Sequence, residues 1–337
     1  MEKVTVAYSS SNAYAFLTGT SILSLYENNK DIKELDVFIF DTGIEQENVQ
    51  KLNSIAEAYG RGITYIKMEP YIDKLRAHGM TAYNGSFATC MKLLITEYFP
   101  ENIDRVLYID SDTIVRGSID ELWKFDMKNN CIGMTIDCMN SKLKEGYGVA
   151  KDKKYCSGAL VLYDLKSYRE KGYTERILTF LKENTINFPF VEQDVLSVCF
   201  CDEISILPMQ YNFISLYEKF SVQEIYHMYN LNDKIFYNET EYNNAKENPI
   251  IVHFPSVYIS RPWYTDCISG WMDEYDKYLY ADGNPFNTYV KEESNMGRMK
   301  KLQKFMYIHM NKCFYIRVQR WASNYLNYRV VKQATGK

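Results

Sequence analysis

An apolar segment that ends in two carboxylates constrains this chain more than any other feature. Residues 106–109 read Val-Leu-Tyr-Ile, which predicts a β-strand, and Asp110 and Asp112 follow it with Ser111 between them. Side chains on a strand alternate between two faces, so both carboxylates can face one ion beyond the strand end. Carboxylate oxygens are preferred ligands of Mn²⁺ and Mg²⁺. The segment therefore predicts a divalent metal site at the carboxyl end of a strand, where open α/β sheets bind their ligands.

Strands and helices are predicted to alternate along the chain. Strand patterns occupy residues 4–9, 35–41, 62–67, 106–109, 131–136 and 158–163, and helical patterns occupy residues 15–26, 87–98, 167–184 and 191–200. This alternation favours an α/β fold with a Rossmann-like, mixed but mostly parallel sheet flanked by helices. The sequence contains no internal repeat, low-complexity tract or Pro/Gly-rich linker. We therefore expect one catalytic domain over residues 1–280 and a basic helical extension over residues 281–337.

Composition limits the partners and the compartment. The 337 residues include 39 basic and 43 acidic side chains, and this slightly negative balance is unlike that of a nucleic-acid binder. The eight cysteines are scattered without a zinc-ligand spacing, which indicates reduced thiols. No apolar run is long enough to span a membrane, and the first residues lead into a strand without a signal-peptide pattern. We therefore expect a cytoplasmic protein.

The C-terminal extension is strongly basic. Between Met296 and Lys337 there are ten basic residues and no acidic one. Apolar residues recur at helical spacing at Met299, Leu302, Met306, Met310 and Cys313, and the lysines largely opposite them are Lys300, Lys301, Lys304 and Lys312. This pattern predicts an amphipathic basic helix, extended by Arg317, Arg320 and Trp321. Two interpretations stay open, namely contact with an anionic membrane surface and packing on the catalytic domain.

Five pieces in a fixed order carry a resemblance to a known family. They are Asn12-Ala13-Tyr14, the strand with Asp110 and Asp112, Cys156-Ser157-Gly158-Ala159, Glu192-Gln193-Asp194, and His253 followed by Arg261-Pro262-Trp263. With these pieces, residues 3–275 resemble the retaining nucleotide-sugar glycosyltransferases of family 8, which include glycogenin and bacterial lipopolysaccharide galactosyl- and glucosyltransferases. The resemblance implies a GT-A type fold. It also implies the transfer of glucose or galactose from a UDP-sugar to a hydroxyl of a cell-envelope glycan or glycolipid acceptor.

The resemblance also assigns roles to individual residues. The expected metal ligands are Asp110, Asp112 and His253, with Mn²⁺ as the expected ion and Mg²⁺ as the alternative. Glu192 and Gln193 are the expected catalytic residues. The remaining expected contacts are Asn212 on the acceptor side and, with the nucleotide sugar, Tyr8, Ser9, Asn12, Tyr14, Lys92, Asp110, Ser111, Asp137, Ser157, Gly158 and Arg261.

Four of these residues depart from the family pattern. Asn12 stands where an aspartate is common, and its amide oxygen can still accept the uracil N–H while Tyr14 stacks on the base. Lys92 replaces an arginine, which keeps the charge and removes the fork of donors. Glu192 replaces an aspartate and is longer by one methylene. Arg261 replaces a lysine and can hold two diphosphate oxygens instead of one.

The sequence leaves alternatives open for both mechanism and function. Double displacement requires a carboxylate on the face opposite the leaving group, whereas front-face substitution requires charge stabilisation and the leaving phosphate as base. We favour front-face transfer with Gln193 near the reacting carbon. A sugar-phosphate nucleotidylyltransferase is an alternative enzyme, but residues 9–14 contain no glycine for its phosphate loop. A non-catalytic, membrane-associated sugar-binding protein would leave the carboxylates and His253 without a role.

Overall fold

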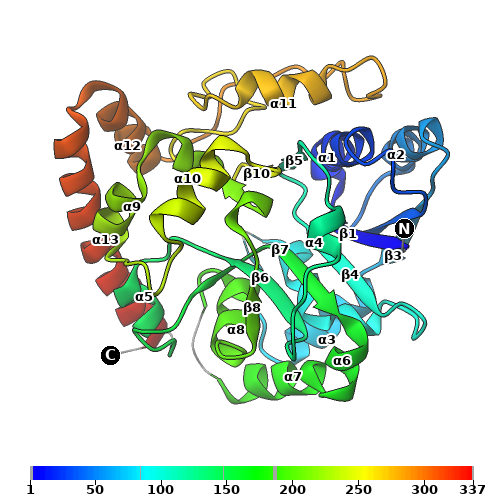
Figure 1. Cartoon of the computed structure of the whole chain (residues 1–337), viewed down its shortest axis with the longest axis horizontal. Coiled ribbons are helices and arrows are strands. Elements are labelled where there is room, and N and C mark those ends of the chain that lie inside the picture. The colour runs from blue at the N-terminus through cyan, green and yellow to red at the C-terminus, as the bar shows by residue number, and fades with distance from the viewer. Residues whose placement is uncertain (1–2, 84, 147, 185–187, 336–337) are drawn as a thin grey trace.

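The computed structural model describes residues 3–83, 85–146, 148–184 and 188–335, and its centre is a seven-stranded sheet (Figure 1). The strand order is β3-β2-β1-β4-β7-β6-β8. Strands β3, β2, β1 and β4 run parallel, as do β6 and β8, while β7 is antiparallel to both β4 and β6. This is the predicted mixed, mostly parallel sheet. Its strands are β1 Val4–Ser10, β2 Leu35–Asp41, β3 Ile63–Lys67, β4 Arg105–Ile109, β6 Ile132–Ile136, β7 Cys156–Asp164 and β8 Ile204–Ile206.

Helices cover both faces of the sheet, which explains why its central strands are apolar on both sides. In β4, Leu107 and Ile109 pack on the face covered by α1, α2 and α4, while Val106 and Tyr108 pack on the face covered by α3, η2, α6, α7 and α8. The first group of helices is α1 Ala15–Glu27, α2 Gln46–Ala58 and α4 Asp120–Trp123. The second group is α3 Glu69–Ala77, the 3₁₀ helix η2 Ala88–Glu97, α6 Leu165–Glu170, α7 Tyr173–Glu183 and α8 Val191–Cys199.

A second, three-stranded sheet lies beyond the carboxyl end of β4. Its order is β5-β10-β9, with β5 Thr113–Val115, β9 Phe213–Ile214 and β10 Ile251–His253. Strand β10 pairs antiparallel with β5, and this register places His253 opposite Thr113. The pairing therefore brings a histidine from late in the chain beside the residue that follows Asp112.

Most of the remaining elements pack on a separate apolar cluster that contains Phe213, Tyr217, Phe220 and Tyr242. Helix α11 instead packs on a smaller cluster through Tyr275 and Leu279. The elements are η1 Asn12–Tyr14, α5 Ser141–Gly146, η3 Met209–Tyr211, η4 Ser215–Lys219, α9 Val222–Tyr229, α10 Glu239–Glu247, α11 Met272–Leu279, α12 Arg298–His309 and α13 Lys312–Thr335.

Two predicted helices differ in the structure. Residues 88–97 form a 3₁₀ helix that is kinked at Leu94, where φ is −105° and ψ is 28°. The predicted helix over residues 167–184 is two helices, because the chain turns at Gly172 with a φ of 63°. A left-handed backbone is readily adopted by glycine, and it interrupts a right-handed helix.

The basic extension also differs from the single amphipathic helix that the sequence predicts. Helix α12 ends at His309, and α13 begins after Asn311, whose Oδ1 accepts the N–H of Cys313. Lys304 pairs with Asp266 at 2.7 Å, and Lys312 pairs with Glu224 at 2.8 Å. These lysines therefore bind the body of the protein, whereas the exposed side chains of α12 include Met299, Leu302, Phe305 and Ile308.

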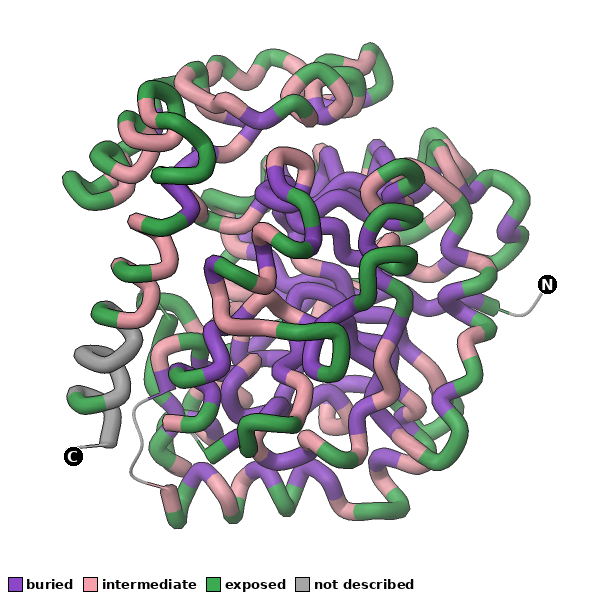
Figure 2. Tube along the Cα trace, turned by 60° about the vertical axis from the view of Figure 1, so that its left-hand side comes forward, coloured by how far each residue is buried: buried purple, intermediate pink, exposed green. Residues whose placement is uncertain are grey.

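The two C-terminal helices run along the outside of the molecule (Figure 2). Helix α13 also contributes to the core, since its Tyr315 and Ile316 are buried in the apolar cluster that contains Phe213 and Tyr217. Within the described part of the chain, none of the helices combines the length and the apolar character that crossing a membrane needs. The predicted domain boundary at residue 280 stays a prediction.

Candidate functional site

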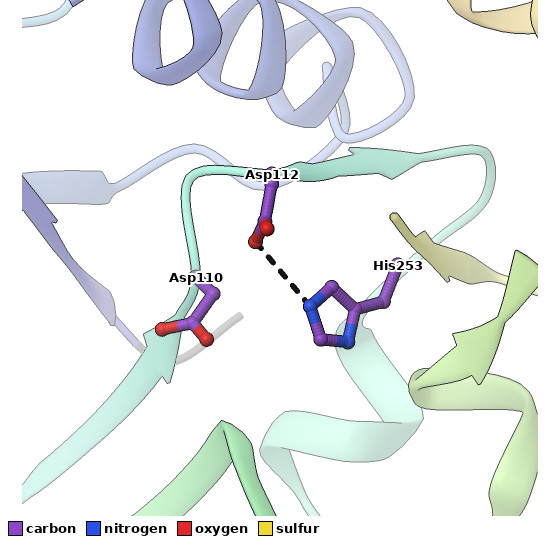
Figure 3. Close-up of side chains that lie close together, drawn as sticks. All are labelled: Asp110, Asp112 and His253. Atoms are coloured by element: carbon purple, nitrogen blue, oxygen red, sulfur yellow. Dashed lines mark ion pairs between the residues drawn. The ribbon is translucent and has the colours of Figure 1, made fainter. Parts of the chain in front are cut away.

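Three side chains that could hold a metal ion meet between the two sheets (Figure 3). Asp110 follows β4, Asp112 precedes β5, and His253 ends β10. Each offers one donor atom, and these atoms lie within 4.8 Å of one another. The Nε2 atom of His253 lies 3.3 Å from Oδ1 of Asp112. The structure thus brings together the three residues that the sequence predicts as metal ligands.

The donor set fits a divalent cation such as Mn²⁺. Two carboxylates and one imidazole combine the oxygen ligands that Mg²⁺ and Mn²⁺ prefer with a nitrogen that suits transition metals. The Nε2 atom of His253 faces the carboxylates, while its buried Nδ1 has no hydrogen-bond partner among the described residues. The side from which His253 can coordinate is therefore the side that faces Asp110 and Asp112.

Arg261 lies against the same carboxylate cluster. It follows Ser260, whose φ is 66°, and its guanidinium Nη2 lies 3.1 Å from Oδ2 of Asp112. Burial opposes ionisation of Asp112, but His253 and Arg261 outweigh burial and lower the pKa of this carboxyl. Asp112 is therefore ionised and already neutralised in part, while the Nε atom of Arg261 donates to the carbonyl oxygen of Phe254 at 3.2 Å.

A fully buried lysine, Lys92, contacts two carboxylates of the site. The Nζ atom of Lys92 donates to the carbonyl oxygen of Gly158 at 2.6 Å and lies 3.2 Å from Asp110 and 3.1 Å from Glu192. Burial lowers the pKa of Lys92, but the two carboxylates outweigh burial and raise it. The sequence predicts a contact between Lys92 and the donor sugar. In the structure its side chain is 0% exposed and pairs with two acidic side chains, and the contact with the donor sugar stays a prediction.

Glu192 has both carboxylate oxygens engaged by the protein. Its Oε1 pairs with Lys92, and its Oε2 accepts a hydrogen bond of 2.8 Å from Thr89. Burial raises the pKa of Glu192, which Lys92 opposes and the nearby Asp110 reinforces. Glu192 is consequently a poor candidate for a free nucleophile in this geometry.

Gln193 is fixed at both ends of its amide group. Its Nε2 donates to Oδ2 of Asp137 at 2.8 Å, and its Oε1 accepts the backbone N–H of Gly158 at 2.9 Å. Burial raises the pKa of Asp137. The absence of a side chain at Gly158 permits Glu192 and Gln193 to pack closely on β7. A Cβ atom at Gly158 would lie 3.1 Å from Oε1 of Glu192 and 3.5 Å from Cβ of Gln193.

The residues predicted to bind the nucleotide differ in how far they are exposed and engaged within the protein. Tyr14 is exposed in η1, and it interacts with Arg261. Asn12 accepts the backbone N–H of Glu45 at 3.0 Å and the Asn48 side chain at 2.7 Å through Oδ1. The predicted bond from uracil to Asn12 would therefore have to replace one of these.

The side chain of Tyr8 is fully buried under α1, and its predicted contact with the nucleotide sugar stays a prediction. Its hydroxyl accepts a hydrogen bond from Ser21, which leaves only its backbone able to reach a ligand. Other predicted contacts are also engaged within the protein. Ser9 donates to the carbonyl of Ala88, Ser111 donates to the carbonyl of Ser9, and Asn212 donates to Ser157 and Thr135.

Three residues near the site were given no role in the sequence prediction. Thr89 lies three positions before Lys92 in η2, and this spacing could have indicated a shared face. Tyr155 and Asp194 are bonded to each other inside the protein. Asp194 follows Gln193 directly, but nothing in the sequence links it to a tyrosine that lies 39 positions earlier.

The fold and the carboxylate–histidine cluster define a GT-A type protein, in which a sheet-end site faces a second small sheet. A family model, glycosyl transferase family 8, matches residues 5–267. The chain therefore belongs to glycosyltransferase family 8, as the sequence motifs indicate, and its class of activity is glycosyl transfer.

Individual relatives have low sequence identity to this chain, but the matches cover most of its length. General stress protein A of Bacillus subtilis is 24% identical over 79% of this chain and 89% of its own length. A lipopolysaccharide 1,2-glucosyltransferase of Escherichia coli is 24% identical over 78% of this chain and 74% of its own length. A crystal structure of the galactosyltransferase LgtC with donor and acceptor sugar analogs superposes with a TM-score of 0.67 at 19% identity, covering 82% of this chain and 95% of that chain. This last likeness shows the fold.

Proposed function

We propose that the protein is a retaining hexosyltransferase that moves glucose or galactose from a UDP-sugar to a hydroxyl of a cell-envelope glycan or glycolipid. The observation that carries the proposal is the cluster of Asp110, Asp112 and His253 beside Gln193 in a family 8 fold. The lipopolysaccharide 1,2-glucosyltransferase among its relatives supports this class of acceptor. Family membership favours this activity over nucleotidyl transfer and over a non-catalytic role.

Each part of the site has a task in this reaction. Asp110, Asp112 and His253 would hold Mn²⁺ or Mg²⁺, which when bound supplies positive charge against the charge that develops on the UDP leaving group. Arg261 would hold diphosphate oxygens with its fork of donors. Tyr14, which is exposed next to Arg261, would stack on the uracil ring.

The hydrogen bonds around Glu192 and Gln193 favour front-face transfer. Both oxygens of Glu192 are engaged, by Lys92 and Thr89, so a covalent sugar on this carboxylate would require the loss of an ion pair. Gln193 is held at both ends of its amide group. An amide offers no carboxylate oxygen that could form an ester with the sugar. We infer that Gln193 stabilises the reacting face while the leaving phosphate takes the proton of the acceptor hydroxyl.

Direct binding of UDP tests the metal site without requiring the acceptor. We expect calorimetry to show UDP binding with Mn²⁺ that is lost with chelator and in Asp112→Asn. The matched control is Asp31→Asn, which changes an exposed aspartate outside the site. UDP release from a panel of nucleotide sugars then identifies the donor. Equal binding of UDP by Asp112→Asn and wild type would overturn the metal site.

We also propose that α12 and α13 contact an anionic membrane surface. Exposed apolar side chains on these helices include Phe305, Ile308, Phe314 and Trp321. They stand in a segment with ten basic residues and no acidic one. Insertion of such side chains combined with basic charge is the chemistry of interfacial helices, in which each cation contributes about 1 kcal/mol near anionic lipid. Glycolipid acceptors would be presented at such a surface.

Vesicle sedimentation tests the membrane proposal. We expect the protein to pellet with phosphatidylglycerol vesicles and not with phosphatidylcholine vesicles. Phe305→Ser combined with Ile308→Ser is expected to weaken this binding, whereas Val290→Ser, at an exposed apolar residue outside both helices, leaves it unchanged. Sedimentation that does not depend on Phe305 and Ile308 would contradict the assignment of this surface.

A further inference from the structure

Asp194 is a buried carboxylate beside the reaction site that the proposed reaction does not use. It lies in the first turn of α8, directly after Gln193, and is 0% exposed. The hydroxyl of Tyr155 donates to Oδ1 of Asp194, and the backbone N–H of Phe190 donates to Oδ2 at 2.8 Å. Both oxygens are therefore directed into the protein and held there.

The backbone between Phe190 and Glu192 is strained. Val191 has a φ of 38°, in the left-handed region that β-branched residues avoid. Its side chain is buried in the apolar core, and the N–H of Gln193 is bonded to the carbonyl of Phe190 at 3.0 Å. The hydrogen bond from the N–H of Phe190 to Asp194 also spans Val191, so two hydrogen bonds close the turn around the strained residue.

The bond from Tyr155 to Asp194 belongs to a closed ring that includes Gln193. Tyr155 reaches Asp194 through its hydroxyl, and its carbonyl oxygen accepts the N–H of Asp137 at 2.9 Å. Asp137 in turn accepts a hydrogen bond from Gln193, the direct neighbour of Asp194. The residue just before β7 and the residue just after β6 are thus joined to the start of α8 around the amide group of Gln193.

We propose that Asp194 and Tyr155 are positioning residues that hold the strained turn at Val191 and thereby fix Gln193 against Asp137 and Gly158. The proposal rests on the proposed function, because it concerns the residue expected at the reacting carbon. Asp194 acts through the backbone of Phe190, and Tyr155 acts through Asp194. Neither side chain touches the substrate in this arrangement, since both are buried.

The experiment compares Tyr155→Phe, Asp194→Asn and Asp194→Ala by amide hydrogen exchange and by steady-state kinetics. Phenylalanine removes one bond to Asp194, asparagine keeps an oxygen for one of the two bonds, and alanine removes both. The matched control is Tyr168→Phe, a buried tyrosine whose hydroxyl bonds the carbonyl of Leu93 outside the ring.

We expect the Phe190 amide to exchange about ten times faster in Asp194→Ala, with smaller increases in Tyr155→Phe and Asp194→Asn. We expect kcat to fall in the same order, about tenfold or more in Asp194→Ala, while the affinity for UDP with Mn²⁺ stays within twofold. Tyr168→Phe is expected to change neither the exchange rate nor kcat.

The outcomes separate four possibilities. Unchanged exchange at Phe190 in Asp194→Ala would show that Asp194 does not hold the turn at Val191, which we call the clamp. Faster exchange with unchanged kcat would overturn its role in positioning Gln193. Complete loss of turnover in Asp194→Asn with full activity in Tyr155→Phe would show that Asp194 reacts directly. If wild type releases UDP from no nucleotide sugar, the proposed function fails. The exchange measurement still decides in that case whether the clamp exists.

Discussion

Lys92 shows at the scale of one residue how the site balances its charges. Its ammonium group is fully buried between Asp110 and Glu192. Removing one partner of a buried ion pair costs roughly 3–5 kcal/mol, because the remaining charge stays in a medium of low polarity. We therefore expect Lys92→Met to lose about this free energy of unfolding in urea denaturation. Lys3→Met, which breaks an exposed pair with Asp36 at 2.7 Å, is expected to lose less than about 1 kcal/mol. Equal losses would contradict this account.

Asp194 makes a second prediction at the residue scale, this time for pH. Burial raises the pKa of Asp194 to about 7, although the bonds from Tyr155 and Phe190 oppose the rise. The pKa of an unfolded aspartate is about 3.9, so between about pH 4 and 7 only the unfolded state loses this proton. The folded protein therefore loses stability as pH rises through this window. Relative to Asp194→Asn, we expect the free energy of unfolding to fall by up to about 1.4 kcal/mol per pH unit. Parallel pH curves for the two proteins would contradict the assignment.

At the scale of elements, the contact between β7 and α8 controls the geometry of the site. A methyl group at Gly158 would lie 3.1 Å from Glu192 and 3.5 Å from both Lys92 and Gln193. Such crowding forces side chains or backbone to shift, which typically costs about 1–3 kcal/mol in a packed region. We expect Gly158→Ala to lower kcat at least tenfold (about 1.4 kcal/mol). Gly62→Ala, where a Cβ meets nothing within 4 Å, is expected to keep full activity. Wild-type turnover in Gly158→Ala would show that the contact is not needed.

The same elements show what the sequence can predict. Strand β4 and its two aspartates were predictable because an apolar run and the period of 2 are local properties of the chain. The register that places His253 beside Asp112 depends on the pairing of β10 with β5, and here only the family resemblance linked the two residues. The burial of Lys92 and the ring through Tyr155 depend on packing between distant elements. Propensity likewise missed the 3₁₀ geometry of η2, because tertiary contacts decide between similar helical forms.

At the scale of the whole molecule, the C-terminal helices are both an outer surface and part of the core. Tyr315 and Ile316 are buried among residues of α9 and η4, and Lys304 and Lys312 pair with acids of the body. Burying a large apolar side chain contributes roughly 1.5–3 kcal/mol. We therefore expect a chain that ends at Met296 to unfold at least several degrees below the full chain in a thermal scan.

The control for this truncation lies on the exposed side of the same helix. Tyr325→Ala removes a side chain that is 52% exposed, so we expect its melting temperature to match wild type, whereas Tyr315→Ala reproduces much of the loss. An independent membrane arm would instead leave residues 1–296 as stable as the full chain and make the two alanine variants equivalent. Loss of stability on truncation, together with vesicle binding through Phe305 and Ile308, would mean that one pair of helices both completes the fold and meets the membrane. The distance from the membrane to the metal cluster would then be set by rigid packing and not by a flexible linker.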